Sequence, residues 1–454
     1  MAFELQFLGG AGTVTGSKYL LTYNNRRILI DCGLFQGLKS LRLKNWERFP
    51  VNPAEIDSVI LTHAHMDHSG YIPRLIKDGF KGKIYSTAAT KDLCKILLPD
   101  SGHLMEEEAE YLNRKGKTKH APALPLFTKK EAERSLEYFE TVPFKQEKNL
   151  GPGFDFKFLF AGHIFGAASI VINIEGRKIA FTGDIGRLND KILYPPESLP
   201  EVDYLVTEST YGDRLHKDSD ILTSLAEVIN ETYRRNGVVI IPAFAVGRAQ
   251  MLMYYLSVLK KEKRIPTFPM YLNSPMATNA SDLLCKYKDL HKLTEDECNE
   301  TCDVVKYVRS VEESKSLNEK KGPMLIISAS GMLTGGRVLH HLKAFAPFPQ
   351  NTILLSGYQA AGTRGEALEK GADEIKIHGE YIPVKAQVKV LDNMSAHADY
   401  KEIIQWLTES KIQPKKVFVT HGDPSAADGL RRRLSETFGW DCVVPSHQDI
   451  VKLE

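Results

Sequence analysis

The chain has 454 residues, of which 43% are hydrophobic and 26% charged, and its net charge is +2. This length and composition predict a globular protein of two or three domains, and the near-neutral charge excludes a global basic field for nucleic acid. With no apolar stretch of about 18 residues, no signal peptide at residues 1–10 and six cysteines without a C-x-x-C motif, we expect a cytoplasmic protein with reduced thiols and no membrane partner.

Two β-hairpins of similar design are predicted in the first 200 residues. The first joins residues 16–21 to residues 27–30 through a turn at 24–25 and ends in Asp31. The second joins residues 166–171 to residues 178–181 through a turn at 175–176 and ends close to Asp184. A second pair of apolar strands, at 59–61 and 417–419, ends each time in Thr-His. This approximate repeat predicts two similar halves that bring Asp31, His63, Asp184 and His421 to one edge.

Residues 61–70 read L-T-H-A-H-M-D-H-S-G and contain four potential metal ligands within six positions. The motif lies between a predicted buried strand at 59–61 and a predicted helix at 71–79. Sites at such strand-to-helix junctions are typical of α/β folds. Neutral imidazole and carboxylate suit zinc and its first-row neighbours, so we predict a metal site here rather than a surface loop with chance histidines. Its predicted ligands are His63, His65, Asp67 and His68.

Strands and helices alternate in the middle of the chain. Strands are predicted at 238–242, 269–272, 325–328 and 353–355, and helices at 247–262, about 281–288 and 337–346. This alternation predicts a doubly wound parallel sheet in a separate domain. The predicted division is 1–208 and 376–454 for the two parts of one domain, and 209–375 for the inserted domain.

Seven motifs in order resemble the metallo-β-lactamase superfamily and, within it, the β-CASP nucleases. They are Asp31, the H-A-H-M-D-H of residues 63–68, His163, Asp184, the E-S-T-Y-G of residues 208–212, the S-A-H-A-D of residues 395–399 and the T-H-G-D of residues 420–423. The resemblance covers nearly the whole chain. It implies an α/β fold in which an αββα metallo-β-lactamase sandwich carries an inserted β-CASP domain. DNA-processing members tend to lack the last histidine, so His421 favours RNA.

The resemblance also implies two zinc ions per chain and a role for each ligand. His63, His65 and His163 would hold the first zinc, Asp67, His68 and His421 the second, and Asp184 would bridge them. Such a centre activates a water molecule for attack on phosphorus. Asp31 would not contact zinc directly. It would orient a ligand histidine or position the water.

Other residues are predicted to act on the leaving group and the substrate. His397 is the predicted general acid for the departing 3′-oxygen, with Glu208 orienting it; His378 and His341 are rivals by residue type alone. Ser330 and Gly331 follow a predicted strand, where backbone N–H groups can approach a phosphate. Arg248 would add a charge contact at the start of a helix.

These features together predict a zinc-dependent ribonuclease acting on single-stranded RNA. One alternative is a small-substrate hydrolase of the thioesterase or lactonase type, against which the long insert and the motifs of His397 and His421 argue. Another is an inactive RNA-binding subunit, against which the complete ligand set argues. The sequence leaves open whether cutting is internal or from the 5′ end, and whether the protein is a homodimer.

Overall fold

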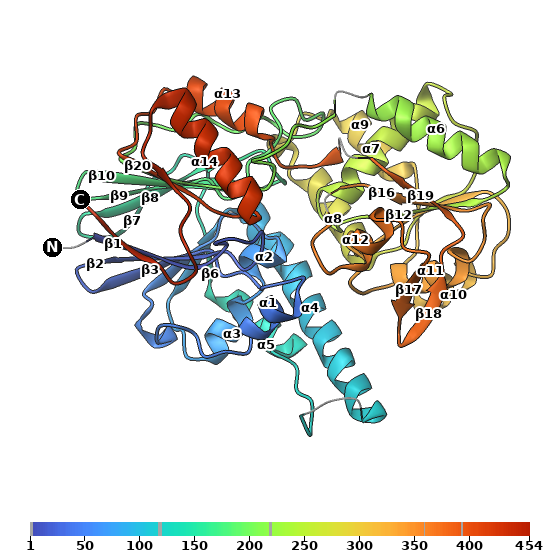
Figure 1. The fold of residues 1–454 in the computed structure, drawn as a ribbon, viewed down its shortest axis with the longest axis horizontal. Coiled ribbons are helices and arrows are strands. Elements are labelled where there is room, and N and C mark those ends of the chain that lie inside the picture. Colours follow the sequence, from blue (N-terminus) through green and yellow to red (C-terminus); the bar gives the residue numbers. More distant parts are fainter. Residues whose placement is uncertain (1–2, 117–119, 218–219, 358, 392–393) are drawn as a thin grey trace. The chain divides into compact units, whose positions relative to one another are not determined.

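The computed structural model describes residues 3–116, 120–217, 220–357, 359–391 and 394–454. The chain divides into two compact units, one formed by Met1–Leu215 with His397–Glu454 and one by His216–Ala396 (Figure 1). We call them unit 1 and unit 2. The domain boundaries proposed from sequence, at 208/209 and 375/376, lie earlier in the chain. The second predicted boundary differs from the observed one because residues 374–390 still contribute strands to unit 2.

Unit 1 contains two seven-stranded sheets. One has the order β22-β1-β2-β3-β4-β5-β6 and the other the order β21-β20-β11-β10-β9-β8-β7. The strands of the first are β1 (Phe3–Gly9), β2 (Lys18–Tyr23), β3 (Arg26–Ile30), β4 (Ser58–Ile60), β5 (Lys83–Ser86), β6 (Phe139–Thr141) and β22 (Ile450–Leu453). Those of the second are β7 (Lys148–Gly151), β8 (Phe154–Phe160), β9 (Ala168–Ile174), β10 (Arg177–Phe181), β11 (Tyr204–Thr207), β20 (Lys416–Val419) and β21 (Cys442–Val443).

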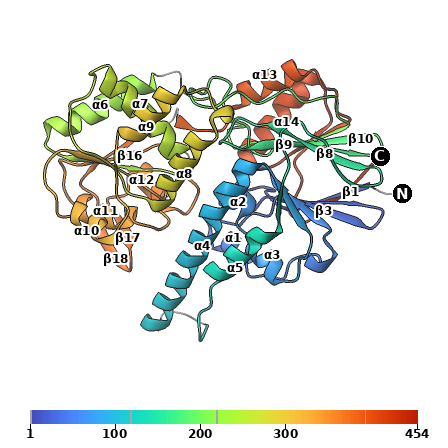
Figure 2. The ribbon, with the colours of Figure 1, turned by 180° about the vertical axis from the view of Figure 1, so that it is seen from behind.

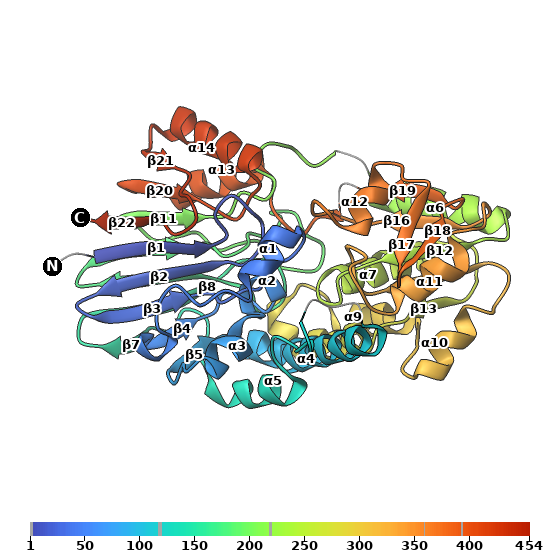
Figure 3. The ribbon, with the colours of Figure 1, turned by 60° about the horizontal axis from the view of Figure 1, so that its bottom comes forward.

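Helices cover the outer faces of both sheets, which confirms the αββα prediction (Figures 1 and 3). The β1–β6 sheet carries α1 (Lys39–Lys44), α2 (Met66–Ser69), α3 (Ile72–Lys77), α4 (Ala88–Lys115) and α5 (Lys129–Ser135), and the other sheet carries α13 (Tyr400–Ser410) and α14 (Pro424–Phe438). In the part of the chain that the structure describes, no helix is both long and apolar enough to cross a bilayer.

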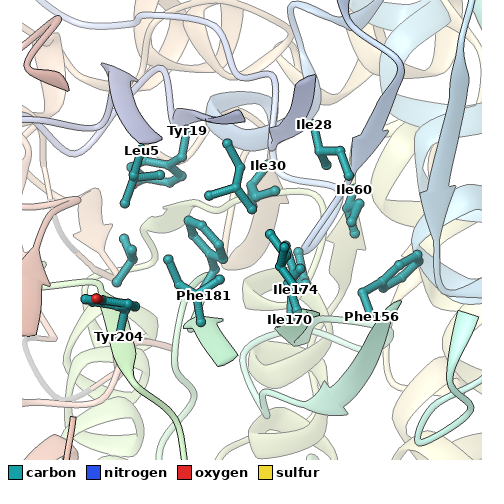
Figure 4. Close-up of a cluster of buried hydrophobic side chains, with 14 of the residues drawn as sticks. Leu5, Tyr19, Ile28, Ile30, Ile60, Phe156, Ile170, Ile174, Phe181 and Tyr204 are labelled. Atoms are coloured by element: carbon teal, nitrogen blue, oxygen red, sulfur yellow. The ribbon is translucent and has the colours of Figure 1, made fainter. Parts of the chain in front are cut away.

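The core of unit 1 lies between its two sheets (Figure 4). In β8 the alternation of Phe154, Phe156 and Phe158 with more exposed neighbours turns all three rings toward the opposite sheet. β1 does the same with Phe3, Leu5 and Phe7. Each fully buried side chain of this size contributes about 1.5–3 kcal/mol by leaving water. The interior therefore holds the two sheets face to face.

The predicted pair of hairpins is present. β2 and β3 pair through Asn24 and Asn25, both with positive φ, and β9 and β10 pair through Glu175 and Gly176, again both positive. Two consecutive residues of positive φ give the turn whose twist matches paired strands. β3 lies beside the parallel strand β4, and β10 lies beside the parallel strand β11, which in turn pairs with the parallel strand β20. The repeat read from the sequence is thus a repeat of topology, with equivalent strand ends at one edge of each sheet.

Unit 2 is built on a parallel six-stranded sheet, ordered β14-β13-β15-β12-β16-β19, with a separate β17–β18 hairpin (Figure 2). The strands are β12 (Val238–Pro242), β13 (Met270–Leu272), β14 (Lys306–Tyr307), β15 (Met324–Ser328), β16 (Thr352–Leu355), β17 (Glu374–Ile377), β18 (Glu380–Pro383) and β19 (Gln387–Val390). The helices are α6 (Ile221–Arg234), α7 (Arg248–Lys261), α8 (Pro275–Lys286), α9 (Glu295–Asp303), α10 (Val311–Leu317), α11 (Val338–Phe345) and α12 (Arg364–Glu369). The prediction of a doubly wound parallel sheet is confirmed.

The expectation of six reduced thiols is wrong for two cysteines. Cys285 of α8 and Cys298 of α9 form a disulfide, and Cys32, Cys94, Cys302 and Cys442 are free. The two helices bring the Cα atoms of the pair to 6.1 Å, within the range that a disulfide spans. The sequence spacing does not reveal this contact because it depends on how α8 and α9 pack.

Removing one ring from the core of unit 1 should destabilise it strongly. Phe158 is fully buried, so Phe158→Ala should lower the free energy of unfolding by about 3–5 kcal/mol. Urea unfolding followed by tryptophan fluorescence measures this, because all three tryptophans lie in unit 1. Lys157→Ala, on the opposite face of the strand, is the control. A loss below about 1 kcal/mol for Phe158→Ala would contradict this description of the core.

Candidate metal centre

The predicted metal ligands lie in unit 1, at or just after the carboxyl ends of strands from both sheets. His63 follows β4 of one sheet, and His163, Asp184 and His421 follow β8, β10 and β20 of the other. Asp67 and His68 belong to α2, directly after the His63 loop. Since the two sheets face each other, their ligand-bearing edges meet. The structure therefore brings all seven predicted ligands together.

One cluster of donor atoms consists of three histidines and one carboxylate oxygen. His65 Nδ1 lies 3.2 Å from His63 Nε2 and 3.1 Å from His163 Nε2. Asp184 Oδ2 lies 3.3 Å from His63 Nε2 and 3.5 Å from His163 Nε2. The four side chains present one ligand atom each to a common point.

A second cluster uses the other oxygen of the same aspartate. His68 Nε2 lies 3.2 Å from Asp184 Oδ1 and 3.2 Å from His421 Nε2. Asp67 Oδ2 lies 3.5 Å from His421 Nε2. Asp67, His68 and His421 form a potential ligand group of their own. Asp184 therefore contacts both clusters, one with each carboxylate oxygen.

The donor spacing fits one metal ion in each cluster. Ligands of a tetrahedral zinc ion bound at about 2.0–2.1 Å are separated by about 3.3–3.4 Å, and the contacts above span 3.1–3.5 Å. Asp184 Oδ1 is buried and accepts no hydrogen bond from a described residue. A buried carboxylate oxygen without a donor is costly, and a bound cation would remove that cost.

In the cluster of His63, His65, His163 and Asp184, the electrostatics favour the metal-binding forms of the side chains. Burial lowers the pKa of His63 to about 3 and also lowers the pKa values of His65 and His163, so their imidazoles are neutral. Burial alone would raise the pKa of Asp184, but the positive charge of the histidines around it, His421 and His68 first, holds that pKa well below its usual range. Neutral imidazole and ionised carboxylate are the forms that coordinate a metal.

Asp31 lies behind His68. Its Oδ2 atom is 2.7 Å from His68 Nδ1, and its carboxylate also accepts hydrogen bonds from the backbone N–H and the hydroxyl of Thr62. Burial lowers the pKa of His68, but Asp184 and Asp31 outweigh it and raise that pKa well above its ordinary value. Of the two roles expected for Asp31, this geometry favours orienting a histidine, because its oxygens are occupied by Thr62 and His68.

Two buried threonines belong to the site although the sequence analysis did not select them. Thr62 Oγ1 lies 3.0 Å from His63 Nδ1 and also contacts Asp31. Thr210 Oγ1 lies 3.2 Å from His421 Nδ1. The Thr62 hydroxyl contacts the His63 nitrogen opposite the one in the cluster, and the Thr210 hydroxyl contacts the His421 nitrogen that also lies 3.4 Å from Asp184 Oδ1. Both hydroxyls can thereby orient a ligand ring. The signal was their position within the motifs, next to His63 and in E-S-T-Y-G.

His397 and Glu208 form a hydrogen-bonded pair beside the clusters. His397 Nδ1 lies 3.0 and 3.2 Å from the two Glu208 oxygens, and 4.0 Å from Asp184 Oδ2. Glu208 is fixed in turn by the backbone N–H groups of Ile185 and Thr210. Burial lowers the pKa of His397, but the carboxylates of Glu208 and Asp184 outweigh it and raise that pKa to about 9. His397 therefore belongs to the site without being part of either ligand group.

The predicted substrate-binding residues lie at the carboxyl edge of the sheet in unit 2. β12 and β15 are parallel neighbours, so Arg248, at the start of α7, and Ser330-Gly331, after β15, are on the same edge. Gly331 approaches the backbone closely, because a Cβ there would lie 3.0 Å from the Phe244 nitrogen. The Ser330 hydroxyl accepts a hydrogen bond from the backbone N–H of Thr334.

The two rival histidines also lie in unit 2. His341 is buried, with its ring nitrogens 2.7 Å from Asn273 Nδ2 and 2.7 Å from Asn318 Oδ1. His378 follows β17, and its ring lies against that of His340. The contacts of His341 are those of a structural group in the core.

Three family models match consecutive parts of the chain. Residues 11–234 match the metallo-beta-lactamase superfamily, residues 249–368 the Beta-Casp domain, and residues 381–445 the Zn-dependent metallo-hydrolase RNA specificity domain. A solved structure of a protein of unknown function from Enterococcus faecalis V583 covers the whole chain with a TM-score of 0.56 at 15% identity, which concerns the fold alone.

Several curated relatives match over nearly the full length. Ribonuclease TTHA0252 of Thermus thermophilus is 35% identical over 437 residues, covering 94% of this chain and 95% of the relative. An RNase J-like protein of Methanocaldococcus jannaschii is 31% identical and covers 92% of each chain. Transcription termination factor FttA of the same organism is 30% identical, covering 99% of this chain and 72% of the relative. These matches confirm the resemblance inferred from the motifs, and the chain belongs to the β-CASP family of zinc-dependent metallo-hydrolases within the metallo-β-lactamase superfamily.

Proposed function

We propose that this protein is a ribonuclease that hydrolyses phosphodiester bonds of single-stranded RNA with two zinc ions per chain. The observation that carries the proposal is Asp184, which faces one donor cluster with each oxygen, with the Glu208–His397 pair beside it. The family supports RNA as substrate: it includes the Thermus thermophilus protein named a ribonuclease. A cytoplasmic location fits such a substrate.

The two clusters divide the ligand roles. His63, His65 and His163 would hold one zinc with Asp184 Oδ2, and Asp67, His68 and His421 would hold the other with Asp184 Oδ1. When bound, the two ions supply a water molecule of lowered pKa and positive charge for the phosphate oxygens. Asp31, Thr62 and Thr210 hold the rings of His68, His63 and His421 in place through contacts to their Nδ1 atoms.

His397 protonates the leaving group. Hydrolysis adds a water oxygen to phosphorus and breaks the bond between phosphorus and the 3′-oxygen, which must gain a proton. Because Nδ1 of His397 is directed to Glu208, the transferred proton is carried on Nε2. The Glu208 carboxylate keeps the ring protonated and aligned. The products are a 3′-hydroxyl and a 5′-phosphate.

The edge of unit 2 adds phosphate contacts. The Arg248 side chain and the backbone around Ser330 and Gly331 lie at the carboxyl ends of parallel strands, where N–H groups and positive charge bind phosphate in α/β folds. These contacts position the RNA and do not take part in the chemical step.

The metal content provides a first test. The purified protein should carry about two zinc equivalents per chain, and Asp184→Asn should lower that content and abolish RNA cleavage, because both clusters lose a ligand. Elemental analysis and a cleavage assay measure the two effects. Asp190→Asn, a change at another buried aspartate of unit 1, is the control. A metal-free Asp184→Asn protein with full activity would rule out the two-zinc proposal.

The choice of substrate provides a second test. Single-stranded RNA should be cut well and DNA of the same sequence poorly, with 5′-phosphate at the new ends. Assays with end-labelled and internally labelled strands, with and without a chelator, measure this and also distinguish internal from 5′-end cutting. Equal rates on DNA, or faster hydrolysis of thioesters, would favour the small-substrate alternative. RNA binding without any cleavage by the zinc-loaded protein would favour the inactive-subunit alternative.

The proton donor provides a third test. His397→Ala should keep its zinc and lower the cleavage rate by about 10²–10⁴. The loss should shrink on RNA whose scissile 3′-oxygen is replaced by sulfur, because a thiolate leaves without a proton. Glu208→Gln should also lose cleavage rate, and the sulfur-substituted RNA should restore that rate, with both effects smaller than for His397→Ala. Loss of zinc from His397→Ala would instead make the histidine a ligand, and an unchanged rate on ordinary RNA would place the general acid elsewhere.

A further inference from the structure

Residues 36–50, which contain α1 and are called the α1 arm below, expose an apolar surface on unit 1. The side chains of Leu38, Leu43 and Trp46 are 46%, 53% and 52% exposed. α1 buries none of its own residues. One segment of nine residues thus exposes three large apolar side chains, and a concentration of exposed apolar side chains is a mark of interaction sites.

The arm is held firmly from its inner side. Asn45 Oδ1 accepts from the Phe35 backbone N–H at 2.9 Å, and Asn45 Nδ2 donates to the Phe35 carbonyl at 2.8 Å. The Phe49 ring stacks on Tyr71 with ring centroids 5.9 Å apart. Asn45 and Phe49 are buried, so the backbone that carries the exposed Trp46 between them is anchored to unit 1.

The arm begins directly beside the metal ligands. In the segment between Asp31 and the arm, the Cys32 N–H donates to the His68 carbonyl at 2.7 Å and the Leu34 N–H to the Met66 carbonyl at 2.8 Å. Both acceptors belong to α2, which carries Asp67 and His68. α1 and α2 lie side by side in unit 1 (Figures 1 and 3). The arm thus extends from the metal centre along a short, hydrogen-bonded path.

The arm also carries an excess of positive charge. Residues 36–50 contain four basic side chains and one acidic side chain, Glu47, whereas the whole chain has a net charge of only +2. Lys39, Arg42 and Arg48 are exposed, and Lys44 is partly buried above the Phe35 ring. The apolar side chains are therefore interleaved with cations, which suits a polyanion that also has flat apolar faces.

We propose that the α1 arm binds the single-stranded RNA substrate, with Trp46 stacking on a base and Lys39, Arg42 and Arg48 contacting phosphates. This combination of an exposed aromatic ring with neighbouring cations is how proteins bind single strands without sequence preference. The proposal rests on the ribonuclease function and adds to it a binding site outside the metal centre. A second copy of the chain would have to bury the three cations, so RNA is the better match.

Tryptophan fluorescence tests the proposal on the intact, zinc-loaded protein. The other two tryptophans, Trp406 and Trp440, are 1% and 6% exposed, so Trp46 is the indole that a ligand can reach. Stopped-flow mixing with a 12-nucleotide oligouridylate should quench the fluorescence before turnover. The same mixture with Trp46→Phe should lose the quench while keeping most of the affinity, because a stacking ring remains.

Substitutions separate stacking from charge. Trp46→Ala should raise the Kd for oligouridylate by about 5- to 100-fold and raise KM with kcat nearly unchanged. Arg42→Ala should weaken binding and reduce the slope of log affinity against log salt by about 0.7. Ile450→Ala and Lys452→Ala, at exposed positions of β22 in the same unit, are the matched controls and should change neither. Zinc content should be equal in all variants.

The outcomes separate the α1 arm from the function on which it rests. The protein could cleave RNA without any fluorescence quench, and the Trp46→Ala and Arg42→Ala variants could keep the wild-type KM. That result would overturn the proposal that the α1 arm binds RNA and would leave the ribonuclease function intact. Absence of both cleavage and binding would overturn the function itself. If Trp46→Ala instead shifts a dimer to a monomer in light scattering and leaves RNA affinity unchanged, the surface is an interface between copies of the chain.

Discussion

The proposed metal centre of unit 1 depends on one buried carboxylate, Asp184, that lies between two groups of side chains. Each oxygen faces a different group, so a single negative charge can separate two cations and reduce their repulsion. The ligands around it come from both sheets, which must therefore pack face to face with the carboxyl ends of β4, β8, β10 and β20 at one edge. The large aromatic and aliphatic core between the sheets holds these strand ends at the same edge. The packing that stabilises the fold therefore also sets the geometry of the site.

Much of this arrangement could be predicted from the sequence, because local signals specify it. The sequence located closely the hairpin turns at 24–25 and 175–176 and the strand at 238–242. It also located the helix that begins after Gly247 and ends before Glu262. The seven predicted ligands were selected from motif spacing and resemblance, and the structure brings them together in two clusters. Features that depend on contacts between distant segments were not found. Thr62 and Thr210 are recognisable only once their histidines are placed. The Cys285–Cys298 disulfide, and the addition of residues 374–390 to unit 2, follow from tertiary packing rather than from local preference.

The distribution of charge explains how a nearly neutral chain can act on a polyanion. No global field is needed if positive charge is concentrated where the strand must lie. In our proposals the metal centre provides such charge when loaded, Arg248 at the edge of the unit 2 sheet adds to it, and the α1 arm contributes the exposed cations Lys39, Arg42 and Arg48. The predicted ligands and the Glu208–His397 pair are buried or partly buried, whereas Trp46 and the cations Lys39, Arg42 and Arg48 of the α1 arm are exposed. Our proposals therefore assign chemistry and RNA binding to different side chains.

Zinc K-edge X-ray absorption of the purified protein tests the central claim most directly, because it reports the atoms around the metal without depending on activity. The account predicts a first shell of nitrogen and oxygen alone at about 2.0–2.1 Å, outer scattering from imidazole rings, and a zinc–zinc path of about 3.5–4 Å. A sulfur shell at about 2.3 Å would place zinc on cysteines instead. The absence of a zinc–zinc path in protein carrying two equivalents would contradict the shared role of Asp184.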